Sequence, residues 1–185
     1  TFVDSSDIDR VDQALRPGTA IMFIETPTNP TLKLTDLSRC AGLCRRRGAR
    51  LVVDNTFASP ALQRPLELGA DIVMHSTTKY INGHSDVVGG VIVTQDDDTH
   101  AKLRKARASF GGSMDPMQSW LVLRGVKTLP MRVRPPWIVT SCSIASSERN
   151  PSVRPSVSAV VSVWNEKPVS NISGRRTKSP GRSGV

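Results

Sequence analysis

Short apolar runs alternate with amphipathic stretches along residues 1–134, and this alternation restricts the fold more than any other feature of the sequence. The apolar runs lie at residues 19–25, 51–53, 71–74 and 87–94. Between them, apolar residues recur every three or four positions, which is typical of helices packed on a sheet. Strands that alternate with helices are joined by right-handed crossovers. The sequence therefore predicts an α/β domain with a mostly parallel, doubly wound sheet.

Capping and charged residues mark the ends of the predicted helices. Thr35, Asp36 and Leu37 open a helix that extends to residue 47, and this opening provides a capping side chain that can accept a backbone N–H. The arginines at 45–47 stand near the C-terminus of that helix, where cations interact favourably with the helix dipole, and Gly48 ends it. Further helices are expected at residues 60–68, 96–107 and 117–126.

The alternation stops after Arg134. Two prolines follow, and residues 135–185 contain 12 serines and 6 prolines with no sustained apolar period. Of the formal net charge of +9, residues 1–134 contribute +4 and residues 135–185 contribute +5. Residues 157–163 have the composition of an isolated strand, but the segment as a whole favours disorder. We therefore expect a domain over residues 1–134 and a tail over residues 135–185 that is disordered or translated out of frame.

Composition argues against several classes of protein. No apolar run approaches the roughly 18 residues of a membrane-spanning helix, and the first five residues lack the basic and apolar regions of a signal peptide. Only 4% of the residues are aromatic, so a platform that stacks nucleic-acid bases is not expected. Binding of nucleic acid by the basic tail is the least favoured function. We expect neither a nucleic acid nor a membrane as partner.

Cysteine usage points to a reducing compartment. The chain has three cysteines, an odd number, and Cys40 and Cys44 stand four residues apart on a predicted helix. No further Cys or His cluster completes a metal site near them. We expect reduced, structural thiols, no metal ion and a cytoplasmic protein.

Polar side chains follow the first three predicted strands, at the ends where a parallel sheet places its ligands. A lysine beside small hydroxyl groups suits a phosphate or an anionic aldehyde cofactor, and a partly desolvated lysine can act as a nucleophile. An aspartate opposite it can pair with a protonated pyridine nitrogen. Taken singly, such an aspartate is often a turn former, and such a lysine is often a solvated surface residue. The polar residues are Glu25, Thr26 and Asn29 after the first strand, Asp54, Asn55 and Thr56 after the second, and His75, Ser76, Thr77, Thr78 and Lys79 after the third.

Three segments at these strand ends carry a specific resemblance. They read ETPTNP at 25–30, VDNTFASP at 53–60, and HSTTKY at 75–80, the last followed by GHSDV at 83–87. Together they resemble the Cys/Met-metabolism (trans-sulfuration) family of pyridoxal-phosphate-dependent enzymes. The likeness runs from about Val3 to Arg134. It implies part of the large domain of the fold-type I, aspartate aminotransferase-like fold.

The resemblance implies pyridoxal phosphate as cofactor and a role for each of seven residues. Lys79 would bind the cofactor covalently and then shuttle protons as the catalytic residue. Asp54 would pair with the pyridine nitrogen. The other implied cofactor-binding residues are Ser76 and Thr78 at the phosphate, Asn29 near the phenolic oxygen, Thr56 against the ring plane, and Glu25 in support of them.

The resemblance also implies a transferase or lyase that acts at the γ-carbon of an amino acid. The segments at 75–79 and 110–116 favour a cystathionine γ-synthase or O-acyl-homoserine sulfhydrylase type. The alternatives are a cystathionine or methionine γ-lyase and an inactive remnant that at most binds the cofactor. Family members form homotetramers built from dimers, and their chains are longer at both ends. We therefore expect a partial chain with weak cofactor binding and negligible turnover on its own.

The composition after Arg134 makes one prediction about the coding DNA. If residues 135–185 are read out of frame, translating the neighbouring DNA in the other two frames restores a family-like helix after Arg134. Sequencing the DNA across codon 134 checks this expectation. The absence of such a helix from both frames contradicts it.

Overall fold

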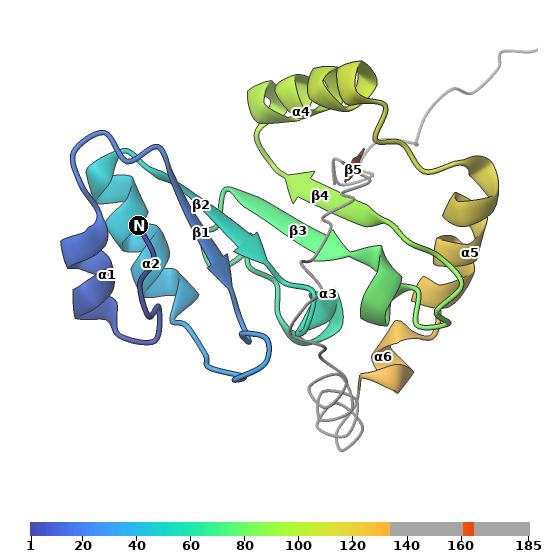
Figure 1. The fold of residues 1–185 in the computed structure, drawn as a ribbon, viewed down its shortest axis with the longest axis horizontal. Coiled ribbons are helices and arrows are strands. Elements are labelled where there is room, and N and C mark those ends of the chain that lie inside the picture. Colours follow the sequence, from blue (N-terminus) through green and yellow to red (C-terminus); the bar gives the residue numbers. More distant parts are fainter. Residues whose placement is uncertain (134–160, 165–185) are drawn as a thin grey trace, which may run out of the picture.

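A computed structural model describes residues 1–133 and residues 161–164 of the chain, the latter as backbone (Figure 1). Short helices alternate with five-residue strands through most of the described part. In chain order the elements are α1 (Ile8–Ala14), β1 (Ile21–Glu25), α2 (Leu37–Arg47), β2 (Arg50–Asp54), α3 (Ser59–Leu62), β3 (Ile72–Ser76), the π-helical segment η1 (Thr77–Ile81), β4 (Gly90–Thr94), α4 (Asp97–Phe110), α5 (Pro116–Val126), α6 (Leu129–Arg132) and β5 (Val161–Trp164).

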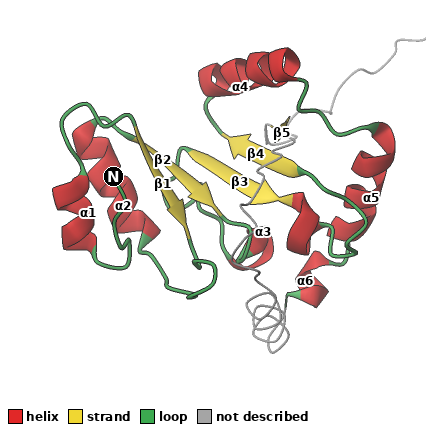
Figure 2. Ribbon diagram, viewed as in Figure 1, coloured by secondary structure: helices red, strands yellow, loops and turns green. Residues whose placement is uncertain are grey.

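The five strands form one sheet in the order β1-β2-β3-β4-β5 (Figure 2). β1, β2 and β3 are parallel, β4 is antiparallel to β3, and β5 is parallel to β4. The mostly parallel α/β sheet that the sequence predicts is therefore confirmed. The described strands follow one another in sequence order, so the order does not reverse among them.

The direction of β4 follows from the connection that precedes it. A parallel return to the start of β3 requires a crossover of about a dozen residues or more, usually a helix. Residues 77–89 instead form η1 and a loop at the edge where β3 ends, and Gly90 pairs directly with Ser76. The chain therefore starts β4 at that edge and runs antiparallel.

The core lies between α1, α2 and one face of β1, β2 and β3. Leu51 and Val53 of β2 are fully buried, as are Cys40 and Cys44 of α2. Alternate residues of a strand point to opposite faces, so Leu51 and Val53 both face these helices. Both cysteines are free thiols, and burial raises the pKa of Cys40 to about 11. The third cysteine, Cys142, lies outside the described residues.

The predicted caps of α2 are confirmed. The Asp36 side chain accepts a hydrogen bond from Arg39 N at 3.0 Å, and Gly48 ends the helix in the left-handed conformation, with φ of 69°. Asp96 and Asp115 cap α4 and α5 in the same way. Each such cap stabilises a helix by about 1 kcal/mol.

Several helices differ from the sequence-based prediction. α4 extends to Phe110 rather than residue 107, and no helix was predicted at η1. α3 covers only Ser59–Leu62 rather than residues 60–68, since Gln63 is extended and Pro65 lacks the N–H that a longer helix needs. α1 begins after a cap formed by Asp7, in a stretch where no helix was predicted. α6 is a single turn, too short to show a period.

The predicted boundary near Arg134 stays a prediction. Disorder or out-of-frame translation of residues 135–185 concerns residues outside the described part, apart from 161–164. These four residues form β5, which overlaps the apolar run at 157–163. Among the described residues, no helix has the length and apolar character needed to cross a membrane.

Two glycines within helices occupy contrasting surroundings. A Cβ atom at Gly125 in α5 would lie 2.2 Å from the backbone oxygen of Asn82, so α5 rests directly on the segment after η1. At Gly42 in α2, the nearest atom to such a Cβ would be Arg46 Nη1, at 3.7 Å. Of these two positions, Gly125 is the one where packing requires glycine.

Alanine at these positions is expected to change stability in opposite directions. Gly125→Ala should lower the free energy of unfolding by about 1–3 kcal/mol, because the methyl group overlaps a backbone oxygen. Gly42→Ala should raise it by about 0.5–1 kcal/mol through helix propensity. Urea unfolding of both variants measures the difference, and a loss of similar size in both would contradict this description of the α5 contact.

Candidate functional site

The predicted polar residues meet at one edge of the sheet. Glu25 and Asp54 are the last residues of β1 and β2 and lie opposite each other in the register. Ser76 ends β3, which runs parallel to β2 (Figure 1). Each of the three neighbouring strands therefore ends in a polar residue, and these residues lie side by side along one edge of the sheet.

These groups lie on the face of the sheet opposite the core. Val53 and Val73 are buried in the core cluster, so their neighbours along the strands, Asp54 and Met74, point to the other face. Ser76, two residues after Met74, shares that face. Phe23 of β1 also lies on it and is 58% exposed. The polar set therefore opens onto the less covered side of the sheet.

Thr56 joins the ends of β2 and β3. Asp54 Oδ1 accepts a hydrogen bond from Thr56 N at 2.9 Å, and Thr56 Oγ1 accepts one from Ser76 N at 2.8 Å. Thr56 is nearly buried, with 9% of its surface exposed. Asp54, Thr56 and Ser76 are therefore held together as one unit, as the sequence led us to expect for neighbouring strand ends.

Lys79 lies in η1, which begins directly after β3. Its backbone departs from helical geometry, with φ of −94° and ψ of −124°, and its side chain is exposed. Around it the segment is closed by backbone hydrogen bonds from Asn82 N to Thr77 O, at 3.1 Å, and from Gly83 N to Lys79 O, at 2.7 Å. The lysine therefore stands at a kink beside the strand edge.

Thr78 makes contacts that the sequence did not reveal. Its Oγ1 accepts a hydrogen bond from Gly89 N at 2.9 Å and donates one to Gly89 O at 3.2 Å. Gly89 must approach closely here, since a Cβ on it would lie 2.8 Å from Thr77 Oγ1. The Thr78 hydroxyl proton is therefore already used to join η1 to the start of β4.

Asn29 lies in the loop between β1 and α2. This loop is closed by backbone hydrogen bonds from Thr28 N to Lys33 O, at 3.0 Å, and from Leu32 N to Thr28 O, at 2.8 Å. Thr26 anchors it to the core, because its buried Oγ1 accepts a hydrogen bond from Thr35 N at 3.1 Å. Asn29 is exposed, and it follows the half-buried Glu25 at the same sheet edge.

A buried polar network lies beneath these turns. Asn55, fully buried, donates from Nδ2 to Gln63 O at 2.8 Å, and Gln63 Nε2 donates back to Asn55 Oδ1 at 2.9 Å and to Thr26 O at 3.4 Å. His75 Nδ1 lies 3.2 Å from Asn55 O. Sequence reasoning placed Asn55 and His75 at strand ends but missed their burial, and it contained no signal for Gln63.

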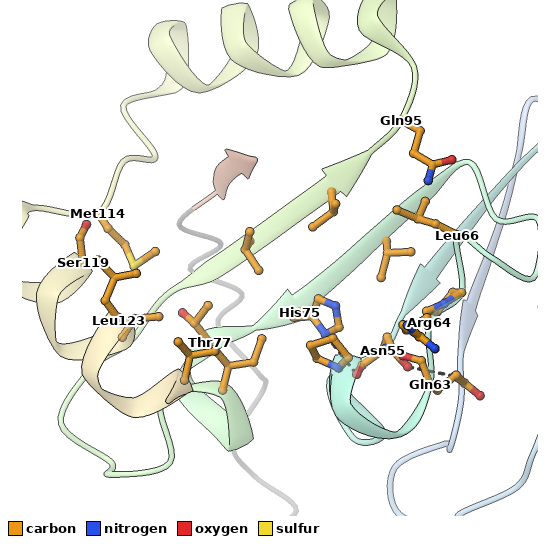
Figure 3. Close-up of a pocket in the computed structure, with 18 of the residues that line it drawn as sticks. Asn55, Gln63, Arg64, Leu66, His75, Thr77, Gln95, Met114, Ser119 and Leu123 are labelled. Atoms are coloured by element: carbon orange, nitrogen blue, oxygen red, sulfur yellow. Dashed lines mark hydrogen bonds between the residues drawn. The ribbon is translucent and has the colours of Figure 1, made fainter. Parts of the chain in front are cut away.

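A cavity lies on the other face of β3 (Figure 3). Its volume is about 690 Å³, and its walls include His75, Thr77, Asn55 and, from α5, Leu123. None of the seven predicted site residues lines it. This follows from strand alternation, since residues 55, 75 and 77 point away from the face that carries Asp54 and Ser76. No cluster of three or more potential metal ligands occurs within residues 1–133 and 161–164.

Comparison with known proteins identifies the family. The model of the family described as "Cys/Met metabolism PLP-dependent enzyme" matches residues 1–147. The chain belongs to this family.

Named relatives and solved structures of trans-sulfuration enzymes are similar to the chain. The cystathionine gamma-lyase of Bacillus subtilis (strain 168) is 52% identical over 133 residues, covering 72% of this chain and 35% of that protein. The probable cystathionine gamma-synthase of Herpetosiphon aurantiacus is 51% identical over 133 residues, covering 72% and 42%. The crystal structure of metB from Corynebacterium glutamicum has a TM-score of 0.70 and 48% identity over 71% of this chain and 34% of that one. The chain thus spans between about a third and two fifths of the length of these proteins.

The residues at the sheet edge fit the cofactor of this family, pyridoxal phosphate. The Asp54 carboxylate and the Ser76 hydroxyl stand at adjacent strand ends and on one open face, and the exposed Lys79 follows Ser76 by three residues in η1. They match the pyridine nitrogen, the phosphate and the aldehyde of that molecule in chemistry.

His75 makes stability depend on pH. Burial lowers the pKa of its imidazole below the usual 6.5, and the hydrogen bond with Asn55 and the charge of Asp54 oppose that shift only in part. As pH falls below about 6.5, the unfolded chain takes up a proton that the folded chain does not. The contribution of neutral His75 to stability is therefore present above this pH and lost below it.

Replacing His75 should weaken that pH dependence. Between pH 7.5 and 5.5, the free energy of unfolding should fall more steeply in the wild type than in His75→Gln, by up to about 1.4 kcal/mol per pH unit for one proton. Urea unfolding at the two pH values measures both slopes, and all other titrating groups are common to the pair. Equal pH slopes in the wild type and His75→Gln would contradict the lowered pKa of His75.

Proposed function

We propose that this chain holds pyridoxal phosphate through Lys79 and forms part of an enzyme that acts at the γ-carbon of an amino acid. The meeting of Lys79, Asp54 and Ser76 at one sheet edge, in a member of a PLP-dependent family, carries the proposal. An amine, a carboxylate and a hydroxyl are the groups that bind an aldehyde, a protonated pyridine nitrogen and a phosphate.

Asp54 is the residue that we assign to the pyridine nitrogen. Thr56 N donates to Oδ1 and so orients the carboxylate, and Oδ2 is the oxygen that we assign to hold the proton of the ring nitrogen. Pyridoxal phosphate, when bound, supplies an electron sink for negative charge on the carbon atoms of a substrate. A proton held at the ring nitrogen by Asp54 strengthens that sink.

Lys79 serves first in covalent attachment and then in proton transfer. Its exposed amine follows the strand edge directly, so it reaches ligands bound at the carboxyl ends of β2 and β3. The same amine, when not bound to the cofactor, would move protons at Cα and Cβ of the amino acid. Both roles need Lys79 to point from the kink toward Asp54.

The remaining assignments concern binding and orientation. Ser76 donates its hydroxyl proton to the phosphate. Thr78 does so only after giving up its 3.2 Å hydrogen bond to Gly89 O, the longer of its two bonds. The other cofactor contacts that we propose are Asn29 near the phenolic oxygen and Thr56 against the ring plane, with Glu25 in support.

For the reaction, we propose γ-replacement of the cystathionine γ-synthase or O-acyl-homoserine sulfhydrylase type, with a homoserine ester or sulfur amino acid as substrate. The segments at 75–79 and 110–116 favour this type. A γ-lyase is the second candidate, because relatives with both names match at similar identity. We also propose a homotetramer, and a cytoplasmic location supported by the free, buried Cys40 and Cys44.

Trapping the bound cofactor tests the central assignment. The chain is mixed with pyridoxal phosphate, reduced with borohydride, digested and mapped by mass spectrometry. The reduced adduct is expected on the peptide that contains Lys79, to disappear in Lys79→Arg, and to persist in Lys127→Arg, which changes an exposed lysine outside the site. Labelling spread evenly over the surface lysines would refute the proposal.

Asp54→Asn measures the contribution of the carboxylate. The neutral amide stabilises a positively charged ring nitrogen much less than the carboxylate does, and loss of a hydrogen bond to a charged group costs about 1.5–3 kcal/mol. The dissociation constant for pyridoxal phosphate should therefore rise about 10- to 100-fold. An absorbance titration measures it, and an unchanged constant would remove Asp54 from the site.

A further inference from the structure

Arg132 of α6 reaches across to the segment that carries Lys79. Its guanidinium donates from Nη1 to Tyr80 O and from Nη2 to Ile81 O, the latter at 3.1 Å. Tyr80 and Ile81 are the two residues that follow Lys79 in η1. One side chain from about fifty positions further along the chain therefore holds two consecutive carbonyl groups of this segment.

The same guanidinium is held in place by the turn between α5 and α6. Nη2 also donates to Gly125 O, at 2.7 Å, and Nε donates to Thr128 Oγ1, at 2.9 Å. Each of the three guanidinium nitrogens thus donates to at least one acceptor, and the planar fork of arginine suits such an arrangement better than the ammonium group of lysine does. Arg132 is therefore oriented before it meets η1.

The surrounding backbone is shaped to fit this side chain. A Cβ atom on Gly83 would lie 2.1 Å from Arg132 Nη1. Gly83 also has a φ of +71°, which residues with a side chain rarely adopt, so both the contact and the backbone favour glycine at this position. Gly125 packs closely against the backbone oxygen of Asn82, the residue before Gly83. Glycines thus leave the space that the guanidinium and α5 occupy.

A second contact holds the loop that follows. Asp86 accepts a hydrogen bond from Asn82 Nδ2 at 2.7 Å and one from Arg124 Nη2 at 2.8 Å. Arg124 thus binds a side chain of this loop rather than the backbone of η1, and its guanidinium lies 5.8 Å from the Trp120 ring centre. Of these two arginines, Arg132 is the one that binds the backbone carbonyl groups of Tyr80 and Ile81.

We propose that Arg132 is a positioning residue for Lys79. By holding the carbonyl groups of Tyr80 and Ile81, it fixes the peptide units after the kink and sets the direction in which the Lys79 side chain leaves the backbone. The inference rests on the proposed function in one respect, that Lys79 is the cofactor lysine. It adds a residue remote in sequence that acts on the site through the backbone.

The first measurement is hydrogen exchange without cofactor. The Asn82 and Gly83 amides donate to Thr77 O and Lys79 O, so they report closure of η1. In Arg132→Met we expect them to exchange at least tenfold faster, while amides of β2 exchange at the wild-type rate. Arg104→Met, which removes an exposed cation of α4, should leave both groups of amides unchanged.

The second measurement is the rate of borohydride trapping of pyridoxal phosphate at Lys79 relative to Lys127 in the same molecule. The ratio should fall at least tenfold in Arg132→Met, recover in part in Arg132→Lys, which keeps the charge but loses the fork, and stay at the wild-type value in Arg104→Met. If Arg132→Met does not fold, Arg132→Lys carries both measurements.

Three results would overturn the inference, and they differ from failure of the proposed function. Exchange that accelerates equally in β2 and η1 would make Arg132 a general stabiliser of the domain. Exchange of the Asn82 and Gly83 amides at the wild-type rate in Arg132→Met would show that Arg132 does not hold η1, and an unchanged trapping ratio would show that it does not position Lys79.

If the wild type itself does not prefer Lys79 over Lys127, the proposed function fails, and the role of Arg132 toward Lys79 as the cofactor lysine fails with it. The exchange data then still decide whether Arg132 holds the segment.

Discussion

The parallel register of β1, β2 and β3 is the constraint on which the rest of the structure depends. Glu25 lies opposite Asp54, and Asp54 lies opposite Met74, so the three strands end at one edge. A shift of one residue in β2 would turn Asp54 toward the core and Asn55 toward the open face. The packing of α1 and α2 opposes that shift, because it requires Leu51 and Val53 on the core face.

Strand alternation then gives neighbouring residues different tasks. Asp54 and Ser76 face the open side and carry the candidate chemistry, whereas Asn55 and His75 face the core. Buried polar groups need hydrogen-bond partners, and these two find theirs in the strand-end turns themselves. The buried side chains of Asn55 and His75 therefore stabilise the turns next to Asp54 through these hydrogen bonds. A cavity on that buried face lies away from the chemistry for the same reason.

Local signals in the sequence predicted local structure well. The Asp36 cap, the arginines near the end of α2 and Gly48 define a helix whose observed bounds agree with the prediction. Apolar runs predicted β1 to β4, and the three strand-end motifs predicted both the family and the candidate residues. The prediction for α3 was wrong because apolar spacing suggested a helix that Pro65 does not allow.

The sequence by itself determined the class of fold, the family and the set of polar residues at the strand ends, because periodicity, caps and short motifs are all local properties. Only the tertiary structure decided the hydrogen bonds between distant segments. These bonds join Gln63 to Thr26, Thr78 to Gly89, and Arg132 to Tyr80 and Ile81. It also decided the antiparallel direction of β4. Such contacts depend on which backbone carbonyl groups approach one another after the chain has packed, and no residue spacing records that.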